Sequence, residues 1–208
     1  MRRHLKSIAA VAVVTAFLCS SLRGTSQSNP SDLFQKLQIE SSTDDARNQL
    51  QALAEKDPQA LKPLASLLPE LISKNPYDNP RTWTNAVMLA GKLKIDSCVP
   101  ALIKWIGIDD VDVAAFTLAE TAKLQTNHAA KSLAMIGDPA VPAVSTVLRQ
   151  GSERERVFAV YILDQIHSAD AMNALKAQSQ QETNPIMRRF IDRILARNSR
   201  NSREMNDE

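Results

Sequence analysis

Apolar side chains recur every three or four residues along most of the chain, with polar residues between them. This spacing places apolar side chains on one face of a helix, whereas a half-buried strand would alternate apolar and polar residues. No alternating stretch of useful length is present, so we expect an all-α protein. The predicted helices span residues 31–39, 44–56, 58–73, 82–94, 96–106, 111–136 with a break near 126–127, 139–150, 153–167, 169–180 and 185–197. The pattern leaves open whether residues 108–127 form one long helix or an additional helix.

Residues 136–151, IGDPAVPAVSTVLRQG, carry two prolines inside otherwise helical spacing. Gly137 can adopt the left-handed conformation that ends a helix, and Asp138 is a favourable N-cap for the next one. Pro139 and Pro142 then fall in the first turn of that second helix, where their missing N–H groups would have no intrahelical acceptor. The segment therefore predicts a turn between two antiparallel helices.

The same arrangement recurs in VMLAGKLKIDSCVPALIKWI, KSLAMIGDPAVPAVSTVL and VYILDQIHSADAMNALKAQ. Each segment combines an apolar helix end, a polar turn with an acidic residue and a second apolar helix. Pro100, Pro142 and Asn173 hold matching places, separated by 42 and 31 residues, and a weaker copy begins at Leu53. Periods of this size are typical of α-solenoids, in which helix pairs stack one on the next.

The clearest copy combines LAMIGDPAVPAV at 133–144 with Leu148, Gly151, Arg156 and Ala159. It resembles the HEAT-like repeats of bacterial proteins and of the phycobilisome-lyase family, which typically read L-x-x-I-G-D-x-x-A-V-P-x-L, then a glycine, then R-x-x-A-A. The turn at 167–169 departs from this pattern because it lacks Gly-Asp-Pro. The resemblance implies a HEAT-like or ARM-type α-solenoid that binds partners on its surface, and it implies no particular activity.

The first residues, MRRHLKSIAAVAVVTAFLCSS, place basic residues before a short apolar run, which is typical of a Sec-type signal peptide. The run is shorter than the roughly 20 apolar residues of a membrane-spanning helix, and Leu18 before Cys19 disfavours a lipoprotein signal. We expect a periplasmic or secreted protein with no integral membrane segment after cleavage. Its expected parts are a signal peptide at 1–28, a HEAT-like helical-repeat domain at 29–197 and a disordered polar tail at 198–208.

The charge balance gives no reason to expect nucleic acid as a partner. The chain has 25 basic and 23 acidic residues, and removal of residues 1–28 leaves 21 basic against 23 acidic. Nucleic-acid binding requires a concentrated basic surface, which a nearly neutral chain does not suggest.

Metal, cofactor and catalytic motifs are missing from the sequence. His128 and His167 each lack a second ligand at metal spacing and are expected to cap helices or face solvent. The acidic cluster at 109–112 lacks the glycine turn and final Glu of a calcium loop and is expected at a helix start. Cys98 is expected to be a buried structural thiol. We therefore expect no cofactor, no metal and no enzymatic activity.

Two features allow a second interpretation. Trp83 stands beside the loop NPYDNPR with Tyr77; we expect it to be packed, and an exposed aromatic patch is the alternative. Arg189, Arg193 and Arg197 follow at four-residue spacing in the last predicted helix. A solvated outer face of a terminal helix explains them, and weak contact with an acidic partner or an anionic lipid surface is the alternative.

These observations favour an exported, non-catalytic scaffold for protein–protein interactions, with a protein as its partner. The second helices of successive repeats commonly line the concave face of a solenoid, so the candidate contact residues are Lys62, Lys104, Ser145, Arg149 and Lys176. The alternatives are an enzyme or enzyme-maturation factor of the bilin-lyase type, and a structural protein of the envelope. The export signal argues against a lyase, because that chemistry belongs with cytosolic substrates.

Overall fold

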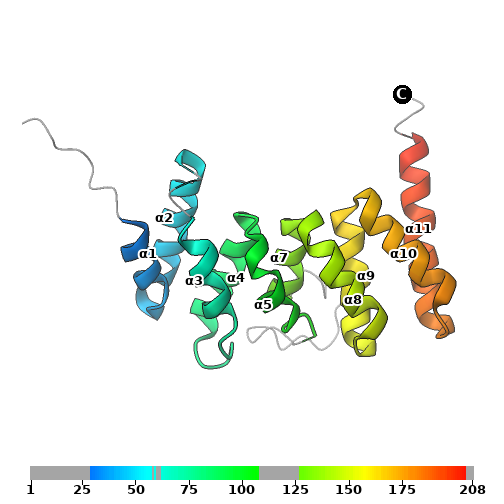
Figure 1. Ribbon diagram of the computed structural model, residues 1–208, viewed down its shortest axis with the longest axis horizontal. Helices are drawn as coiled ribbons and strands as arrows, with labels where there is room; N and C mark the ends of the chain where they lie inside the picture. The colour runs from blue at the N-terminus through cyan, green and yellow to red at the C-terminus, as the bar shows by residue number, and fades with distance from the viewer. Residues whose placement is uncertain (1–28, 58, 60–61, 108–126, 205–208) are drawn as a thin grey trace, which may run out of the picture.

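The computed structural model describes residues 29–57, 59, 62–107 and 127–204, and side chains up to Arg200. Within these ranges the regular elements are helical, which confirms the all-α prediction. The helices follow one another in chain order along the long axis of the molecule, from α1 at one end to α11 at the other (Figure 1). They are α1 (Pro30–Leu37), α2 (Thr43–Lys56), α3 (Leu64–Ile72), α4 (Pro80–Lys92), α5 (Val99–Ile103), α7 (His128–Ile136), α8 (Val141–Gln150), α9 (Glu153–Ile166), α10 (Ala169–Gln181) and α11 (Pro185–Glu204). One-turn 3-10 helices precede α2, α5 and α8: η1 (Glu40–Ser42), η3 (Asp96–Cys98) and η4 (Asp138–Ala140).

The helices pack in two rows. In the first row α2 contacts α4, α4 contacts α7, α7 contacts α9, and α9 contacts α11. In the second row α3 contacts α5, α5 contacts α8, and α8 contacts α10. Consecutive helices alternate between the rows, and the buried apolar residues of both rows form one core. Residues 108–126, between α5 and α7, are not described. Because α7 packs directly on α4 and α8 on α5, both rows continue on the two sides of this gap.

Residues at matching positions of the sequence repeats are buried in the same way. Two residues before Pro100, Pro142 and Asn173 lies a fully buried small residue, respectively Cys98, Ala140 and Ala171. Two residues after them lies a fully buried aliphatic residue, respectively Leu102, Val144 and Leu175. The same face of α5, α8 and α10 therefore points into the core, as the spacing of apolar residues requires.

The turn between α7 and α8 differs in one detail from the prediction. Gly137 has φ 85° and ψ −140°, a conformation that favours glycine, and its N–H donates to the carbonyl oxygen of Leu133 at 3.2 Å. Asp138 makes no capping hydrogen bond through its side chain, so its predicted role as N-cap is wrong. A 3-10 turn leads into α8 instead, because the Ala140 N–H donates to the Gly137 carbonyl at 2.8 Å. Pro142 is the second residue of α8, where no hydrogen bond is lost.

Local capping fixes the ends of α9. Ser152 and Glu155 form a capping box, in which the Ser152 side chain accepts from the Glu155 N–H and the Glu155 carboxylate accepts from the Ser152 N–H. At the other end His167 takes a left-handed conformation with φ 56°, and Ser168 caps α10. His167 is exposed and ends a helix, as its position in the sequence predicts.

Other boundaries shift where contacts are not local. Asn127 caps α7 and also donates to the carbonyl oxygens of Trp105 and Ile106, so α7 begins at His128; the part of the predicted helix before it lies outside the described residues. The last helix continues to Glu204, beyond the end expected at Arg197, and Asn198 is buried against Asp164 at 3.0 Å. Residues 198–204 therefore belong to the helix. The predicted signal peptide and the acidic cluster at 109–112 lie outside the described residues. No helix in the described ranges is both long enough and apolar enough to cross a bilayer.

Candidate functional site: a groove at the turns

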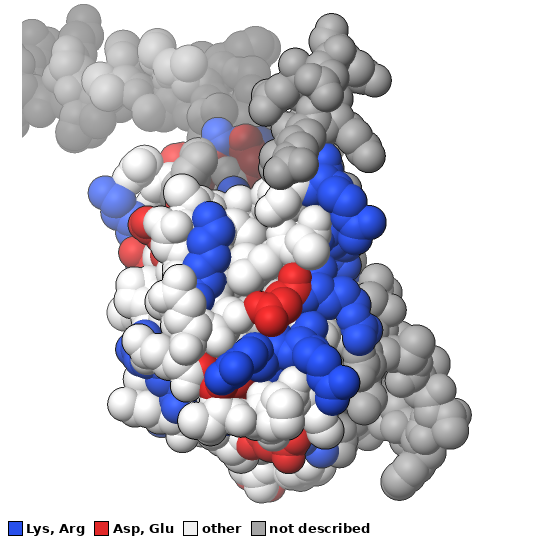
Figure 2. Space-filling model, turned by 90° about the vertical axis from the view of Figure 1, so that its right-hand side faces the viewer, with Lys and Arg blue, Asp and Glu red and all other residues white. Residues whose placement is uncertain are grey.

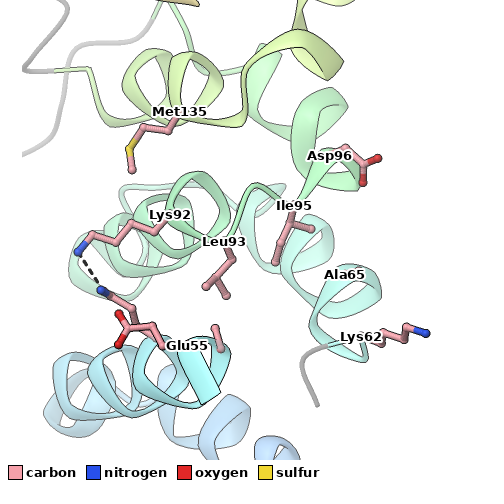
Figure 3. A pocket seen from close by; sticks show the side chains of 10 residues that line it. Glu55, Lys62, Ala65, Lys92, Leu93, Ile95, Asp96 and Met135 are labelled. Atoms are coloured by element: carbon pink, nitrogen blue, oxygen red, sulfur yellow. Dashed lines mark hydrogen bonds between the residues drawn. The ribbon is translucent and has the colours of Figure 1, made fainter. Parts of the chain in front are cut away.

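A groove with a volume of about 550 Å³ lies on the side of the molecule where first-row helices end and second-row helices begin. Its walls come from the C-terminal parts of α2, α4 and α7, from the start of α3 and from the turn before α5 (Figure 3). The lining residues are Gln51, Ala54, Glu55, Lys62, Ala65, Lys92, Leu93, Ile95, Asp96 and Met135.

The floor of the groove is apolar because of how α4 ends. Lys94 takes a left-handed conformation with φ 50°, and the Ile95 N–H donates back to the carbonyl oxygen of Ala90 at 3.0 Å. Leu93 and Ile95, on either side of this reversal of the chain, both line the groove. Both side chains are half-buried, and Met135 from α7 reaches the same groove with 37 % of its surface exposed.

A close approach of α4 and α7 holds Leu93 and Met135 on neighbouring walls. A Cβ on Gly91 would lie only 2.7 Å from the Cα of Ser132, so α7 occupies the space that a side chain would need. The Ser132 hydroxyl donates to the carbonyl oxygen of Val87 at 2.8 Å across the same contact. The two helices are thus packed backbone to backbone beside the groove, which gives it a rigid wall.

Charged side chains of both signs form the rim. The Lys92 ammonium donates to the Gln51 side-chain oxygen at 2.9 Å and joins α4 to α2, as the dashed line in Figure 3 shows. Glu55, Lys62 and Asp96 are exposed around the opening. A rim with two acidic and two basic groups has no strong preference for one sign of charge. The groove is therefore suited to an apolar side chain flanked by polar or charged neighbours.

The residues predicted to contact a partner do not converge. Lys62 lines the groove. Lys104, Arg149 and Lys176 are exposed on or directly after α5, α8 and α10, so they are spread along the second row, away from the groove. Ser145 is only 8 % exposed, and its selection as a contact residue is wrong. It lies one turn after Val141 on the inner face of α8, which turns it toward the core.

Sequence reasoning missed Met135 and Leu93. The two residues hold the same place in successive repeats, because they are separated by the same 42 residues as Pro100 and Pro142. That repetition marks equivalent helix ends, and it was available in the sequence. It does not show that the ends lie open side by side, which depends on how α4 packs against α7.

The side chains considered as candidate reactive or binding groups lie in packed or isolated positions in the described part of the chain. Cys98 is buried, and its pKa is raised to about 12, first by burial and then by the nearby Asp96 carboxylate. The thiolate that would act as a nucleophile is therefore scarce at neutral pH. In the described ranges no three His, Cys, Asp or Glu side chains are grouped so that they could hold a metal ion. Trp83 is 6 % exposed, which confirms the packed interpretation, while Tyr77 remains 58 % exposed.

Comparisons of the chain with protein-family models, with curated proteins and with solved structures find no match. Its function is therefore inferred from its own residues.

Proposed function

We propose that this protein is a non-catalytic binding module: an exported bacterial α-solenoid of HEAT-like repeats whose groove holds an apolar-anchored segment of a protein partner. The two rows of helices and the recurrence of buried positions around Pro100, Pro142 and Asn173 support the solenoid. The observation that carries the binding function is the exposure of Met135 over the half-buried apolar floor of a 550 Å³ groove.

The physical case for binding rests on the kind of surface that the groove offers. Burial of exposed apolar surface contributes about 25 cal/mol per Å², and a groove of this volume falls in the range that holds small ligands or a few side chains. Methionine is flexible and polarisable, so Met135 can pack against differently shaped apolar side chains. Charged groups at the rim then orient the flanking residues of the partner.

A displayed peptide library tests this proposal, with the chain from residue 29 onward as bait. We expect the enriched peptides to carry an apolar residue with polar neighbours. In a titration by fluorescence polarisation, Met135→Glu should weaken the binding of an enriched peptide about tenfold or more, because it places a charge over the apolar floor. Ile39→Glu is the matched control, since Ile39 is also a large exposed apolar residue, at 54 %, but lies outside the groove.

Other results would overturn the proposal in distinct ways. Failure to enrich any peptide contradicts the binding function, and unchanged affinity of Met135→Glu contradicts the groove. In the second case, loss of binding in a Lys104→Glu, Arg149→Glu double variant would move the contact to the second row. A stable spectral shift of a bilin added to the protein would favour the lyase alternative instead.

A further inference from the structure

The last helix has one face that no described element covers. Met187, Ile191 and Ile194 of α11 are buried, and α11 packs against α9 and α10. On the opposite side Arg189, Arg193 and Arg200 are exposed. Figure 2 looks onto this end of the molecule, where Lys and Arg side chains gather in a band. Basic side chains thus predominate in this band of the described surface.

The arginines form one stripe. Residues 189, 193, 197 and 200 follow at spacings of four, four and three, which keeps them on one side of a helix over about 16 Å. Arg197 borders the stripe and is bound to Asp164 at 2.5 Å. The nearest acidic side chain on α11, Asp192, accepts a hydrogen bond from Ser179. Ile186 begins the stripe and is 67 % exposed.

A terminal helix whose outer face contacts only water does not require a stripe of arginines. The outer face of a terminal helix has to be polar, but like charges at four-residue spacing destabilise a helix. The helix at the other end avoids this cost, because Asp32 and Lys36 stand four residues apart on the exposed side of α1 with opposite signs. Among the described side chains of α11 five arginines stand against one acidic residue, Asp192, and an anionic partner explains this excess better.

We propose that the outer face of α11 docks onto an anionic lipid bilayer. Guanidinium groups bind phosphates through two parallel hydrogen bonds, so Arg189, Arg193 and Arg200 would hold lipid phosphates. Ile186 would lie at the level of the headgroups. This inference goes beyond the proposed function and does not depend on the groove.

A bilayer fits this face better than an acidic protein does. A protein interface usually buries an apolar core inside its polar rim. Among the described side chains of α11, Ile186 is the large apolar residue left exposed, which is too little for such a core. A charged bilayer surface needs mainly cations, each of which strengthens binding separately. The helices that line the groove, from α2 to α7, lie toward the opposite end of the long axis from α11 (Figure 1).

Co-sedimentation with vesicles tests the docking surface, using the chain from residue 29 onward. We expect binding to vesicles of phosphatidylcholine mixed with phosphatidylglycerol, no binding to phosphatidylcholine alone, and weaker binding as salt rises. Each arginine should contribute about fivefold to the partition coefficient. The triple variant Arg189→Gln, Arg193→Gln, Arg200→Gln should therefore lose about a hundredfold, and Ile186→Ser should lose severalfold.

The matched control removes the same charge elsewhere. Lys36 and Lys56 are exposed on α1 and α2, and Lys74 is exposed just after α3. Their triple Gln variant should retain binding within a few fold. Equal loss in both triple variants, or no binding of the unaltered chain, would overturn the proposal. Tighter binding to a poly-glutamate peptide than to the vesicles would replace it with an acidic protein partner. Met135→Glu should bind vesicles normally, so this test is separate from the test of the groove. Thermal unfolding checks that each variant is folded.

Discussion

The indole N–H groups of Trp83 and Trp105 both donate to one acceptor, the carbonyl oxygen of Ile72, at 3.0 and 2.9 Å. The two rings meet edge to face with centroids 6.1 Å apart. Ile72 is the last residue of α3, Trp83 lies in α4, and Trp105 follows α5. One carbonyl at a helix end therefore ties together three consecutive helices of the two rows, which explains why Trp83 is buried beside an exposed loop.

This shared acceptor predicts non-additive effects. Trp83→Phe or Trp105→Phe alone leaves the Ile72 carbonyl with one donor, so each should cost about 1 kcal/mol for the hydrogen bond, beyond the effect of the smaller ring. The double variant leaves the carbonyl without either donor and should cost more than the sum of the single variants. Urea unfolding of the unaltered protein, the two single variants and the double variant gives the four free energies of unfolding that this comparison needs. Strict additivity would contradict the shared role of Ile72.

Backbone conformation should decide the effect of substitutions at two helix ends. Gly137→Ala places no Cβ within 4 Å of another group, but φ 85° with ψ −140° strains any other residue, so it should cost about 1–3 kcal/mol. His167 carries a side chain at φ 56°, and His167→Gly should stabilise the protein by up to about 1 kcal/mol. Thermal unfolding tests both. A stabilising Gly137→Ala would contradict the assigned conformation.

Arg156 neutralises a buried carboxylate. Glu182 is 2 % exposed and accepts hydrogen bonds from Arg156, from the Gln178 amide at 2.9 Å and from the Asn184 N–H at 3.0 Å. Arg156→Met would leave that charge buried without its cation and should cost about 3 kcal/mol. Adding Glu182→Gln to Arg156→Met should recover part of the loss, because it removes the uncompensated charge. If the double variant is less stable than Arg156→Met, the uncompensated charge of Glu182 is not the cause of the stability lost in Arg156→Met.

The stability contributed by Asp44 should depend on pH. Hydrogen bonds from Arg81 and then from Asn85 hold the pKa of the Asp44 carboxyl below its ordinary value of 3.8. A depressed native-state pKa means that the contribution is complete at pH values above 3.8 and is lost as the pH falls through the lower native value. Asp44→Asn should therefore be less stable than the unaltered protein at neutral pH, and the difference should shrink in acid.

Denaturant unfolding over a pH series measures this difference. Arg81→Gln is the matched variant because it removes the partner of the same carboxylate, and its stability should converge on that of the unaltered protein over the same acidic range. A difference that stays constant from neutral pH to the acid limit would show that Asp44 contributes through packing and not through its charge.

Local sequence was sufficient for much of the fold. Spacing of apolar residues predicted helices on both sides of each turn, and short-range chemistry predicted their ends where the bonds stay within a few residues, as in the conformation of Gly137. It failed where another local hydrogen bond formed instead of the expected one, and where a distant segment bound the chain. Asp138 was expected to cap α8, but the bond from Ala140 to the Gly137 carbonyl forms a 3-10 turn instead. Residues 198–204 were expected to be disordered, but Asn198 is bound to Asp164 of α9.

The candidate site was predicted less well than the fold. Lys62 was chosen as a contact residue and does line the groove, whereas Ser145 was chosen from its polarity and is turned into the core by its place one turn after Val141.

The sequence by itself determined that the chain is helical, where most turns fall and which positions repeat, because these follow from spacing and bonds within one or two turns. Only the tertiary structure decided which helix ends lie open together. Met135 and Leu93 meet at one groove because Gly91 lets α7 approach α4 closely, and the arginines of α11 are left uncovered because no described helix follows to pack on them. Both depend on distances between segments far apart in the chain, which periodicity cannot encode.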